Sequence, residues 1–420
     1  MQSAFRGPVV IGKRPYEHGK GNFLVLARHL SAPDGIMLAM LKLTWKQAAA
    51  WRVHRQHLDQ RARSGSMLTV ASRLCGLHAQ VMSSAELTLW ARVENLDRRA
   101  VRKALWEDRS LVKTWAMRGT LHLLPAREFP LWHAGLSASR RYLRPNAWRN
   151  YFGITMEELD TLTDAVAKAL EGRVLTREEL IQQVGRLTGS SELGAKLGES
   201  WGMILKPAAF TGRLCFAQSI GQRVRFTHPA TWLAARDAQR IDPETAMIDI
   251  SRRFLAAYGP ATHRDLARWW GGGGGMTAVR KWIALLGNEV SEVSLDDAPA
   301  WMLAAHARKL RDLPMKRSVR LLPGFDQYVV AASHHAAQLL PGDLRSRVYR
   351  PQGWISPVLL VDGFMQGVWR HEIKGSHIEV VIEPFVKAPA WVRRAAGEDA
   401  ERLAEFLGGS LKLAWKDCRG

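Results

Sequence analysis

The apolar residues of this chain follow a helical period over long stretches and then change to strict alternation. Helical spacing predicts amphipathic helices over four early segments: 43–56, 67–75, 84–93 and 98–107. Thr44 stands at a helix-capping position at the start of the first segment, and Asp97 stands at one before the fourth. Ser83 and Ser84 are the expected caps at the start of the third segment, where Glu86 would complete a capping box.

The period then shortens to two residues. LVKTWAM (111–117) and TLHLLP (120–125) alternate on either side of Arg118-Gly119, which predicts a β-hairpin with a two-residue turn. Short helices followed by a hairpin are the order of elements in a winged-helix domain. The segment rich in Arg and Lys just before the hairpin, residues 98–106, is then expected to be the recognition helix.

Helices followed by strand-like segments recur twice more, without a strict sequence repeat. The second set has helical spacing over 156–170, 176–187 and 197–206, and strand-like segments 214–219 and 223–229 around Gly221. The third set has helical spacing over 245–259, 262–271 and 276–287, followed by strand-like residues 288–297. We therefore expect three tandem winged-helix units.

The C-terminal part has a different character. Residues 317–385 are rich in strand-forming residues, and Asp362-Gly363 is a hairpin turn. A helix over 397–407 and a strand over 410–415 are expected to follow. These features predict a small β-barrel or sheet and, for the whole chain, an α+β fold.

These patterns divide the chain into five segments. We expect winged-helix units at 43–150, 151–240 and 241–316, and a β-barrel-like region at 317–420. Residues 1–42 show little periodicity and form an N-terminal extension. It is either disordered or the result of a start codon assigned too early.

The chain carries a large positive charge. It has 60 Lys and Arg against 39 Asp and Glu, a formal net charge of +21, and the basic residues are spread along its length. Such a field favours polyanionic partners, nucleic acid first and an anionic membrane second. A generally basic proteome would produce the same excess.

Several other functional classes find little support. Cys75, Cys215 and Cys418 are scattered and odd in number, so they predict neither a disulfide framework nor a zinc site and fit a reducing cytoplasm. No apolar run reaches the ~18 residues of a membrane span. The glycine run 271–275 lacks the Gly-Lys-Ser/Thr of a phosphate-binding loop and is expected to be flexible.

Basic residues of the first predicted winged helix are candidates for DNA contact. They are Arg99, Arg102, Lys103, Lys113, Arg118 and His122. The first three share one face of the predicted recognition helix, for which a merely solvated face is the alternative. The next two lie at or near the wing, which commonly contacts phosphate or the minor groove. The histidine lies in a hairpin strand, where it could reach a phosphate or be packed.

Two further features are candidates for the site. Gly76-Leu77-His78-Ala79-Gln80 places a polar His-x-Gln pair on a short connector between predicted helices. Such a pair could hold a water molecule, although an isolated polar pair in a connector is more commonly a cap or a turn. Asp326 lies in a predicted strand, where it could face a cleft or make a structural hydrogen bond.

With these segments in place, the chain resembles the AlkZ/YcaQ-like winged-helix DNA glycosylases. The resemblance runs from about Leu43 to near the C-terminus. Five segments carry it: LTWKQAAAWRVHRQHLD (43–59), GLHAQVMSSAELTLWAR (76–92), RSLVKTWAMRGTLHLLP (109–125), RLLPGFDQYVV (320–330) and VLLVDGFMQGVWR (358–370). The resemblance implies tandem winged helices forming a C-shape, with a small β-barrel near the C-terminus.

The resemblance also implies an activity. Members excise alkylated purines, including bulky or crosslinked adducts, in base excision repair or in self-resistance of antibiotic producers. We therefore expect a monomeric, cytoplasmic protein that associates with the bacterial nucleoid by binding double-stranded DNA that carries alkylated purines. The family's catalytic motif, Gln-x-Gln or Gln-x-Asp, falls here on His78-Ala79-Gln80. Gln80 matches the motif and His78 departs from it, so a non-catalytic DNA-binding protein, a regulator or damage-shielding factor, is the alternative.

The chemistry of the bond suggests roles for both residues. Breaking an N-glycosidic bond builds positive charge on the deoxyribose, and an N7- or N3-alkylated purine leaves without much protonation. The enzyme then needs a positioned water and a field that stabilises the sugar cation. We assign Gln80 to positioning the water, and His78, with an ordinary pKa of about 6.5, to positioning or to general-base catalysis. This hydrolysis needs no metal or redox cofactor, and no neighbouring lysine in the sequence suggests Schiff-base chemistry.

Overall fold

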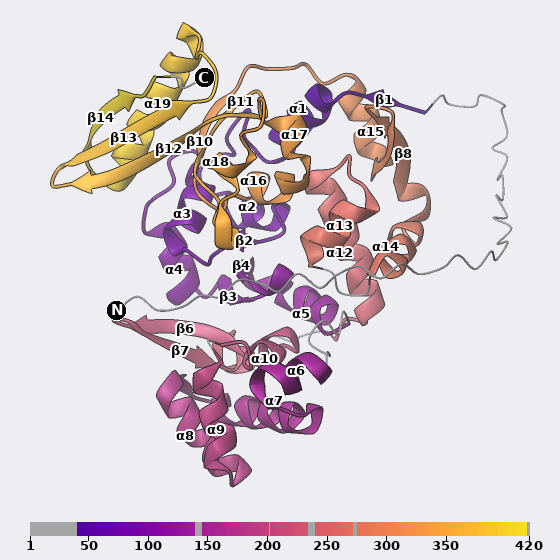
Figure 1. Cartoon of the computed structure of the whole chain (residues 1–420), viewed down its shortest axis with the longest axis vertical. Helices are drawn as coiled ribbons and strands as arrows, with labels where there is room; N and C mark the ends of the chain where they lie inside the picture. Colours follow the sequence, from indigo (N-terminus) through magenta and orange to yellow (C-terminus); the bar gives the residue numbers. More distant parts are fainter. Residues whose placement is uncertain (1–39, 139–144, 201, 234–239, 272–274, 418–420) are drawn as a thin grey trace, which may run out of the picture. The chain divides into compact units, whose positions relative to one another are not determined.

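The computed structural model describes residues 40–138, 145–200, 202–233, 240–271 and 275–417 (Figure 1). Most of the predicted N-terminal extension and of the glycine run 271–275 lies outside these residues. From Met40 onward the chain forms one compact unit. Within the described ranges, no helix combines the length and the apolar character that crossing a membrane requires.

A three-stranded sheet organises the first set of elements. They are β1 (Lys42–Leu43), α1 (Trp45–Arg55), α2 (Met67–Arg73), β2 (Leu77–His78), α3 (Met82–Trp90), α4 (Ala100–Trp106), β3 (Leu111–Trp115) and β4 (Leu121–Pro125). The strand order is β2-β4-β3, with both pairings antiparallel. The predicted hairpin is confirmed, and Arg118 (φ 58°) and Gly119 (φ 69°) make the left-handed turn that reverses the chain. Thr44 caps α1 in a capping box, as predicted.

Helices α5 (Phe129–Ala138) and α6 (Pro145–Phe152) lead to the second set. It contains α7 (Met156–Leu170), β5 (Val174–Thr176), α8 (Arg177–Thr188), α9 (Ser191–Glu199), α10 (Lys206–Phe210), β6 (Cys215–Ile220), β7 (Arg223–Thr227) and α11 (Pro229–Trp232). Its sheet has the order β5-β7-β6. The helix predicted over 197–206 is wrong. Ser190 caps α9 earlier in the chain, and Gly202, with φ 83°, breaks the helical path before α10.

The third set repeats this order with one change. It contains α12 (Pro243–Tyr258), α13 (His263–Trp270), α14 (Gly275–Ala284), β8 (Val290–Leu295), β9 (Ala298–Leu303) and α15 (Ala304–Arg311). A single residue, Ala261, takes the place of the short strand by bridging Trp301 in β9. The strand predicted over 288–297 is β8 alone, because Asp296 and Asp297 adopt left-handed conformations that start the hairpin to β9.

The three sets therefore share one plan. Each has a helix, a short strand or bridging residue, helices, and then a hairpin. In each set the short strand or bridging residue pairs with the second strand of the hairpin. In the third set β1, from the start of the described chain, adds a parallel strand to the sheet beside β8.

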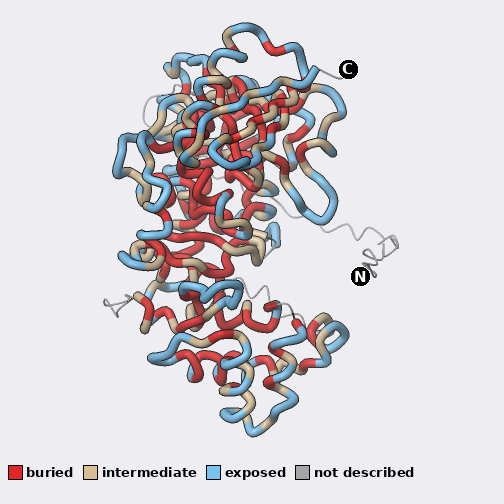
Figure 2. Tube along the Cα trace, turned by 90° about the vertical axis from the view of Figure 1, so that its left-hand side faces the viewer, coloured by how far each residue is buried: buried red, intermediate tan, exposed pale blue. Residues whose placement is uncertain are grey.

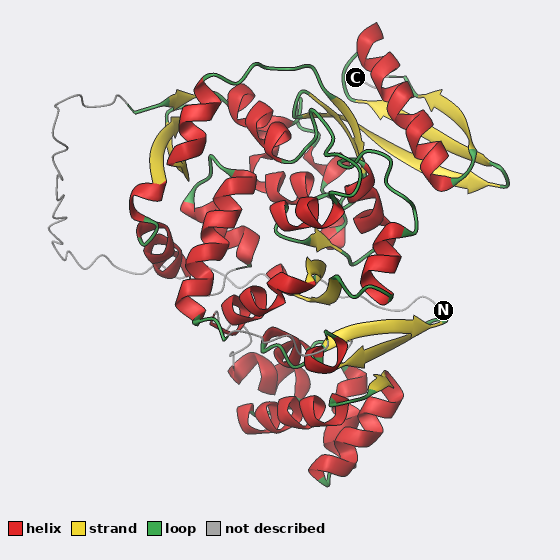
Figure 3. Ribbon diagram, turned by 180° about the vertical axis from the view of Figure 1, so that it is seen from behind, coloured by secondary structure: helices red, strands yellow, loops and turns green. Residues whose placement is uncertain are grey.

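The predicted C-terminal β-barrel is instead an open sheet. The sheet has five strands, β10 (Val319–Leu322), β11 (Val358–Val361), β12 (Phe364–Lys374), β13 (His377–Pro384) and β14 (Ser410–Trp415), paired in that order. A barrel would require β10 to pair with β14, but these strands are the two edges. The physical reason is α19 (Ala390–Leu407), which covers one face of the sheet and packs against β10, β13 and β14 (Figure 3).

Two further predictions concern this region. The Asp362-Gly363 turn is confirmed between β11 and β12. The segment after β10 is not a strand, because Asp326 caps α16 (Gln327–Ala331) through a hydrogen bond from the Tyr328 N–H. Helices α17 (Ala336–Leu339) and α18 (Arg345–Val348) follow before β11.

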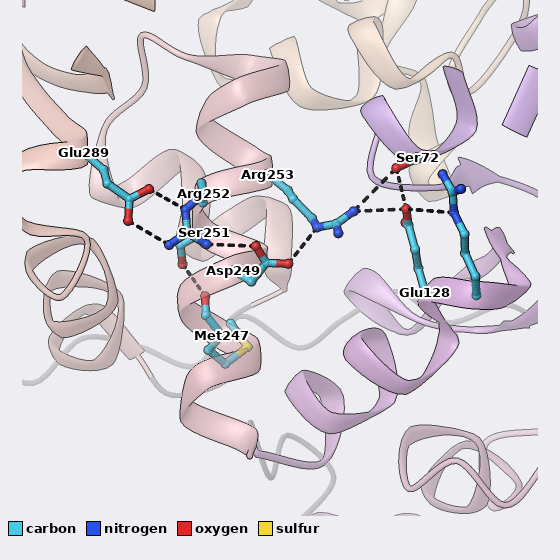
Figure 4. A network of polar contacts seen from close by, with 9 residues as sticks. Ser72, Glu128, Met247, Asp249, Ser251, Arg252, Arg253 and Glu289 are labelled. Atoms are coloured by element: carbon cyan, nitrogen blue, oxygen red, sulfur yellow. Dashed lines mark hydrogen bonds and ion pairs between the residues drawn. The ribbon is translucent and has the colours of Figure 1, made fainter. Parts of the chain in front are cut away.

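Buried side chains join these sets to one another. Figure 2 shows buried positions (red) along the inner parts of the chain and exposed positions (pale blue) on its outer turns. Ala49 and Val53 of α1 belong to the same hydrophobic cluster as the C-terminal sheet. Polar contacts add a second connection, since Arg253 of α12 pairs with Glu128, which also accepts a hydrogen bond from Ser72 of α2 (Figure 4). The first set therefore contacts the C-terminal sheet through apolar side chains of α1 and contacts α12 of the third set through polar groups.

Candidate active site

A glycine allows β2 to approach β4 closely. Gly76 has φ 89°, and a Cβ at this position would lie 2.6 Å from Leu124 Cδ2 and 3.1 Å from the Leu123 carbonyl oxygen. Any larger residue would therefore be strained in conformation and would push β2 away from β4. The pairing that follows sets His78 directly opposite His122.

The helix that follows β2 begins without a side-chain cap. Its N-cap residue is Val81, and the predicted caps Ser83 and Ser84 lie inside α3. In the other two sets the corresponding helix starts at a threonine, Thr176 for α8 and Thr262 for α13, and both threonines form capping boxes. The chain therefore omits a standard stabilising feature at the place where the His-x-Gln pair lies.

His78 is packed inside a group of aromatic rings. Its side chain is 6% exposed. Phe325 stacks on it with ring centroids 4.9 Å apart and an interplanar angle of 10°. His122 meets it edge to face at 5.6 Å. The buried Nδ1 atom of His78 has no hydrogen-bond partner in the described residues, so its hydrogen-bonding capacity is unused in this structure.

The surroundings keep both histidines neutral. Burial, together with the charge of Arg118, lowers the pKa of His78 to about 4. Burial first, and then Arg118 and His78, hold the pKa of His122 well below its ordinary value. The Nδ1 of His122 lies 3.0 Å from the Thr120 carbonyl oxygen. Because a carbonyl only accepts, this nitrogen carries the proton, and Nε2 is left as an acceptor 3.4 Å from Arg118 Nη2.

Arg118 lies beside the histidines rather than on an exposed wing tip. It is half-buried and donates a hydrogen bond to the Trp269 carbonyl oxygen at 2.7 Å. It also lines a cavity of about 60 Å³ together with residues of α1, α12, α13 and α16, which is room for a few water molecules. Its charge is therefore fixed within the site, where it disfavours protonation of His78 and His122.

Gln80 differs from His78 in exposure. The side chain of Gln80 is exposed, and its Oε1 lies 3.5 Å from the backbone N–H of Leu121 at the start of β4. The His-x-Gln motif thus places one neutral ring inside the protein and one amide at the surface. A water that bridges between the two positions would meet an acceptor on the buried side and both donors and acceptors on the exposed side.

A buried ion pair fixes the ring that stacks on His78. Arg92 and Asp326 make two hydrogen bonds of 2.7 Å, and both side chains are 0% exposed. Asp326 follows Phe325 directly, and the Gln327 amide donates to the Gly76 carbonyl oxygen at 2.9 Å. The C-terminal region therefore fixes both the ring that stacks on His78 and the start of the strand that carries His78. Of the two roles considered for Asp326, facing a cleft or making a structural hydrogen bond, the structure shows the structural one.

The remaining predicted DNA contacts lie apart from His78 or are buried. Arg99 is exposed at the start of α4, while on the same helix Arg102 pairs with Glu86 and Lys103 pairs with Asp108. Lys113 is half-buried with its Nζ 5.6 Å from the centroid of Phe216 of β6, and burial lowers its pKa. His122 is 0% exposed. Of the two roles left open for His122, contact with a phosphate or packing, the structure shows a side chain packed against His78.

Sequence reasoning missed Arg92, Phe325 and Gln327. A signal existed for Arg92, a charged residue directly after the apolar segment LTLWA, since buried charges require a partner. The partner lies 234 residues away in sequence, and one sequence offers no means of locating it.

Comparisons with known proteins identify the family of this chain. A family model described as "DNA glycosylase AlkZ-like" matches residues 71–406. The chain belongs to the AlkZ-like DNA glycosylases, and it is an enzyme of this class. A relative from Streptomyces sahachiroi, the "Interstrand DNA cross-link repair glycosylase", is 36% identical over 371 residues, covering 88% of this chain and 98% of the relative. The solved structure of Streptomyces sahachiroi DNA glycosylase AlkZ matches with a TM-score of 0.82, covering 90% of this chain and 100% of the other.

Proposed function

We propose that this enzyme hydrolyses the N-glycosidic bond of purines alkylated at N7 or N3 in duplex DNA, including purines in interstrand crosslinks. The family supports the reaction class, and the name of the Streptomyces sahachiroi relative supports the crosslinked substrate. The observation that carries the proposal is the neutral, buried His78 close in sequence to the exposed Gln80. This pair lies just before α3, which lacks the side-chain cap that the corresponding helices α8 and α13 both have.

The reaction begins with departure of the alkylated purine, which already bears a positive charge. The developing sugar cation is a strong electrophile, so a weak base is sufficient for the attacking water. The Gln80 amide orients this water, and a neutral His78 ring nitrogen accepts its proton as the bond to C1′ forms. A low pKa helps in a second way, because an imidazolium would repel the sugar cation.

DNA binding is the second part of the proposal. We infer that the three sets of elements are winged helices, that the chain acts as a monomer, and that they are arranged around the duplex as a C-shape. In this interpretation α4 is the recognition helix of the first set, and Arg99 is its residue most available to phosphate. Lys113 and Arg118 act indirectly, through packing and through the charge near the histidines.

The decisive experiment measures release of the base. Duplex DNA carrying N7-methylguanine is incubated with excess enzyme, and free base is quantified for the wild type, Gln80→Ala and His78→Ala. We expect release by the wild type and a large loss in both variants, with binding to undamaged duplex retained. A wild-type protein that binds DNA and releases no base from N7-methylguanine or from a crosslinked duplex would instead support the non-catalytic alternative.

A further inference from the structure

One tryptophan near the site is exposed to solvent. Of the tryptophans in the described ranges, Trp354 alone is largely exposed, with 50% of its surface accessible. Its ring lies edge to face with Phe325 at a centroid distance of 5.1 Å. Phe325 in turn stacks on His78. A row of three rings therefore runs from the buried histidine to the protein surface.

The backbone holds Trp354 in place. Its N–H donates to the Pro351 carbonyl oxygen at 3.3 Å, and its own carbonyl accepts from the Arg350 N–H at 2.8 Å. Gln352 and Gly353 form the turn with φ of 59° and 76°. The loop is thus a defined turn with a large aromatic side chain at its end.

The loop that carries Phe325 touches this turn directly. A Cβ at Gly324 would lie 2.9 Å from the Ile355 carbonyl oxygen, so a larger residue at position 324 would separate the two loops. The Arg92–Asp326 ion pair fixes the residue after Phe325. The position of Trp354 relative to His78 is therefore set by close contacts at each step.

An exposed tryptophan leaves a large apolar surface in water, which favours a partner with a flat face. The partner must also fit the surroundings: Arg350 and Gln352 are exposed on the same turn, and the chain carries a net charge of +21. A nucleobase offers a flat ring beside negative phosphates, whereas an apolar protein surface would leave the arginine without a counter-charge. Stacking of bases on aromatic side chains is a general mode of nucleic-acid binding.

We propose that Trp354 stacks on a nucleobase of the bound DNA beside the damaged nucleotide and positions the sugar of that nucleotide against His78. The inference rests on the proposed function, since it assumes that damaged DNA lies at His78. Trp354 is a positioning residue here, because it acts through the placement of the DNA and contacts neither the sugar nor the water.

The test uses a DNA that needs no chemistry. The duplex carries a tetrahydrofuran abasic analogue in place of the damaged nucleotide, and the fluorescent base 2-aminopurine is the adjacent nucleotide. We compare the full-length wild type with Trp354→Ala, Trp354→Phe and a control, Tyr151→Ala, which removes an 82% exposed aromatic side chain from α6. Melting temperatures confirm that each variant is folded.

We expect the 2-aminopurine fluorescence to be quenched by the wild type and by the Tyr151 control. Trp354→Ala should lose the quenching and bind about tenfold more weakly, and Trp354→Phe should recover part of both. Single-turnover base release at saturating enzyme should also fall about tenfold in Trp354→Ala. Equal quenching and equal affinity for the wild type and Trp354→Ala would overturn the proposal.

These outcomes separate the inference from the proposed function. Quenching that depends on Trp354, in a wild type that releases no base, would support the stacking contact and reject the glycosylase assignment. Base release by the wild type that is unchanged in Trp354→Ala, with unchanged quenching, would support the assignment and reject the contact.

Discussion

The short strands β2 and β5 occupy the same place in two sheets of the same strand order, since each pairs with the second strand of its hairpin. Strand β5 ends in Thr176, which caps α8 directly. After β2, Ala79 and Gln80 separate the strand from Val81, the N-cap residue of α3, which makes no side-chain cap hydrogen bond. Where β5 leads directly into a capped helix, the end of β2 and the residues after it instead carry His78 and Gln80.

The difference places the missing cap beside the two residues for which we propose a catalytic role. Sequences that specify a fold satisfy local rules at most positions, and departures concentrate at functional sites. The first set compensates by contacts from far along the chain, namely the Arg92–Asp326 pair and the hydrogen bond from Gln327 to Gly76. Strand β2 is thus positioned by tertiary contacts, and β5 leads directly into a locally stabilised helix.

The largest effect is expected from breaking this tertiary support. Asp326→Asn leaves the Arg92 guanidinium buried without a counter-charge, which should lower the free energy of unfolding by about 3–5 kcal/mol. Denaturant titration followed by circular dichroism measures the loss. Asp164→Asn is the matched control from the second set, because Asp164 pairs with Arg213 at the surface and should lose no more than about 1 kcal/mol. Similar losses in both variants would contradict the assigned role of the buried pair.

The second largest effect concerns the exposed member of the motif. Gln80→Ala should reduce single-turnover base release by about 10²–10³-fold, the usual result of removing a polar group that acts only in the transition state. Binding to undamaged duplex should change less than twofold. Gln182→Ala, at an exposed position of α8, is the control and should match the wild type. Full activity in Gln80→Ala would exclude Gln80 from the reaction.

His78 should show its role through pH. With a pKa of about 4, its ring stays neutral at neutral pH, so wild-type release should be constant from about pH 8 to pH 5 and fall as pH approaches 4. His78→Gln, which restores the commoner motif, should keep activity without this fall, and His78→Ala should lose more than His78→Gln. Equal rates of base release in all three proteins would show that His78 has only a structural role.

Stability should depend on pH through the same group. The folded-state pKa of His78, about 4, lies below its unfolded value of about 6.5. The unfolded chain therefore binds more protons between these values, and stability contributed by the neutral ring is lost as pH falls from about 6.5 to 4. The difference in unfolding free energy between the wild type and His78→Gln should follow this trend, as measured by denaturant titrations at several pH values.

The sequence could predict local features and not the contacts that complete the site. Helical spacing located α7 to the residue, and the Arg118-Gly119 and Asp362-Gly363 turns followed from their residue types. The resemblance aligned the family's catalytic motif with His78 and Gln80. The stacking of Phe325 on His78 joins residues from opposite halves of the chain, and the open C-terminal sheet depends on how α19 packs. Periodicity contains no information on either.

A smaller effect is expected on the basic face of α4. Arg99 is exposed, whereas Arg102 pairs with Glu86 and Lys103 with Asp108. Arg99→Ala should weaken binding a few-fold for all sequences and reduce the slope of log affinity against log salt by about 1, since one phosphate contact is lost. Glu244→Ala, which removes an exposed acidic residue from α12, should leave the slope unchanged. An unchanged slope in Arg99→Ala would show that Arg99 makes no phosphate contact and that the DNA does not lie along α4.

The smallest effect tests the missing cap itself. Val81 already has the extended backbone of an N-cap residue, with φ −115° and ψ 114°, so Val81→Thr supplies an acceptor for the N–H of Ser84, three residues on. We expect a gain of about 0.5–1 kcal/mol in unfolding free energy, and a loss of about 1 kcal/mol in the reciprocal change Thr176→Val. Because β2 is held by Gln327 and the pairing with β4, base release by Val81→Thr should stay within twofold of the wild type. A large loss of release with a gain in stability would show instead that the uncapped turn takes part in the reaction, since the cap would then fix a conformation that the bound DNA needs to change.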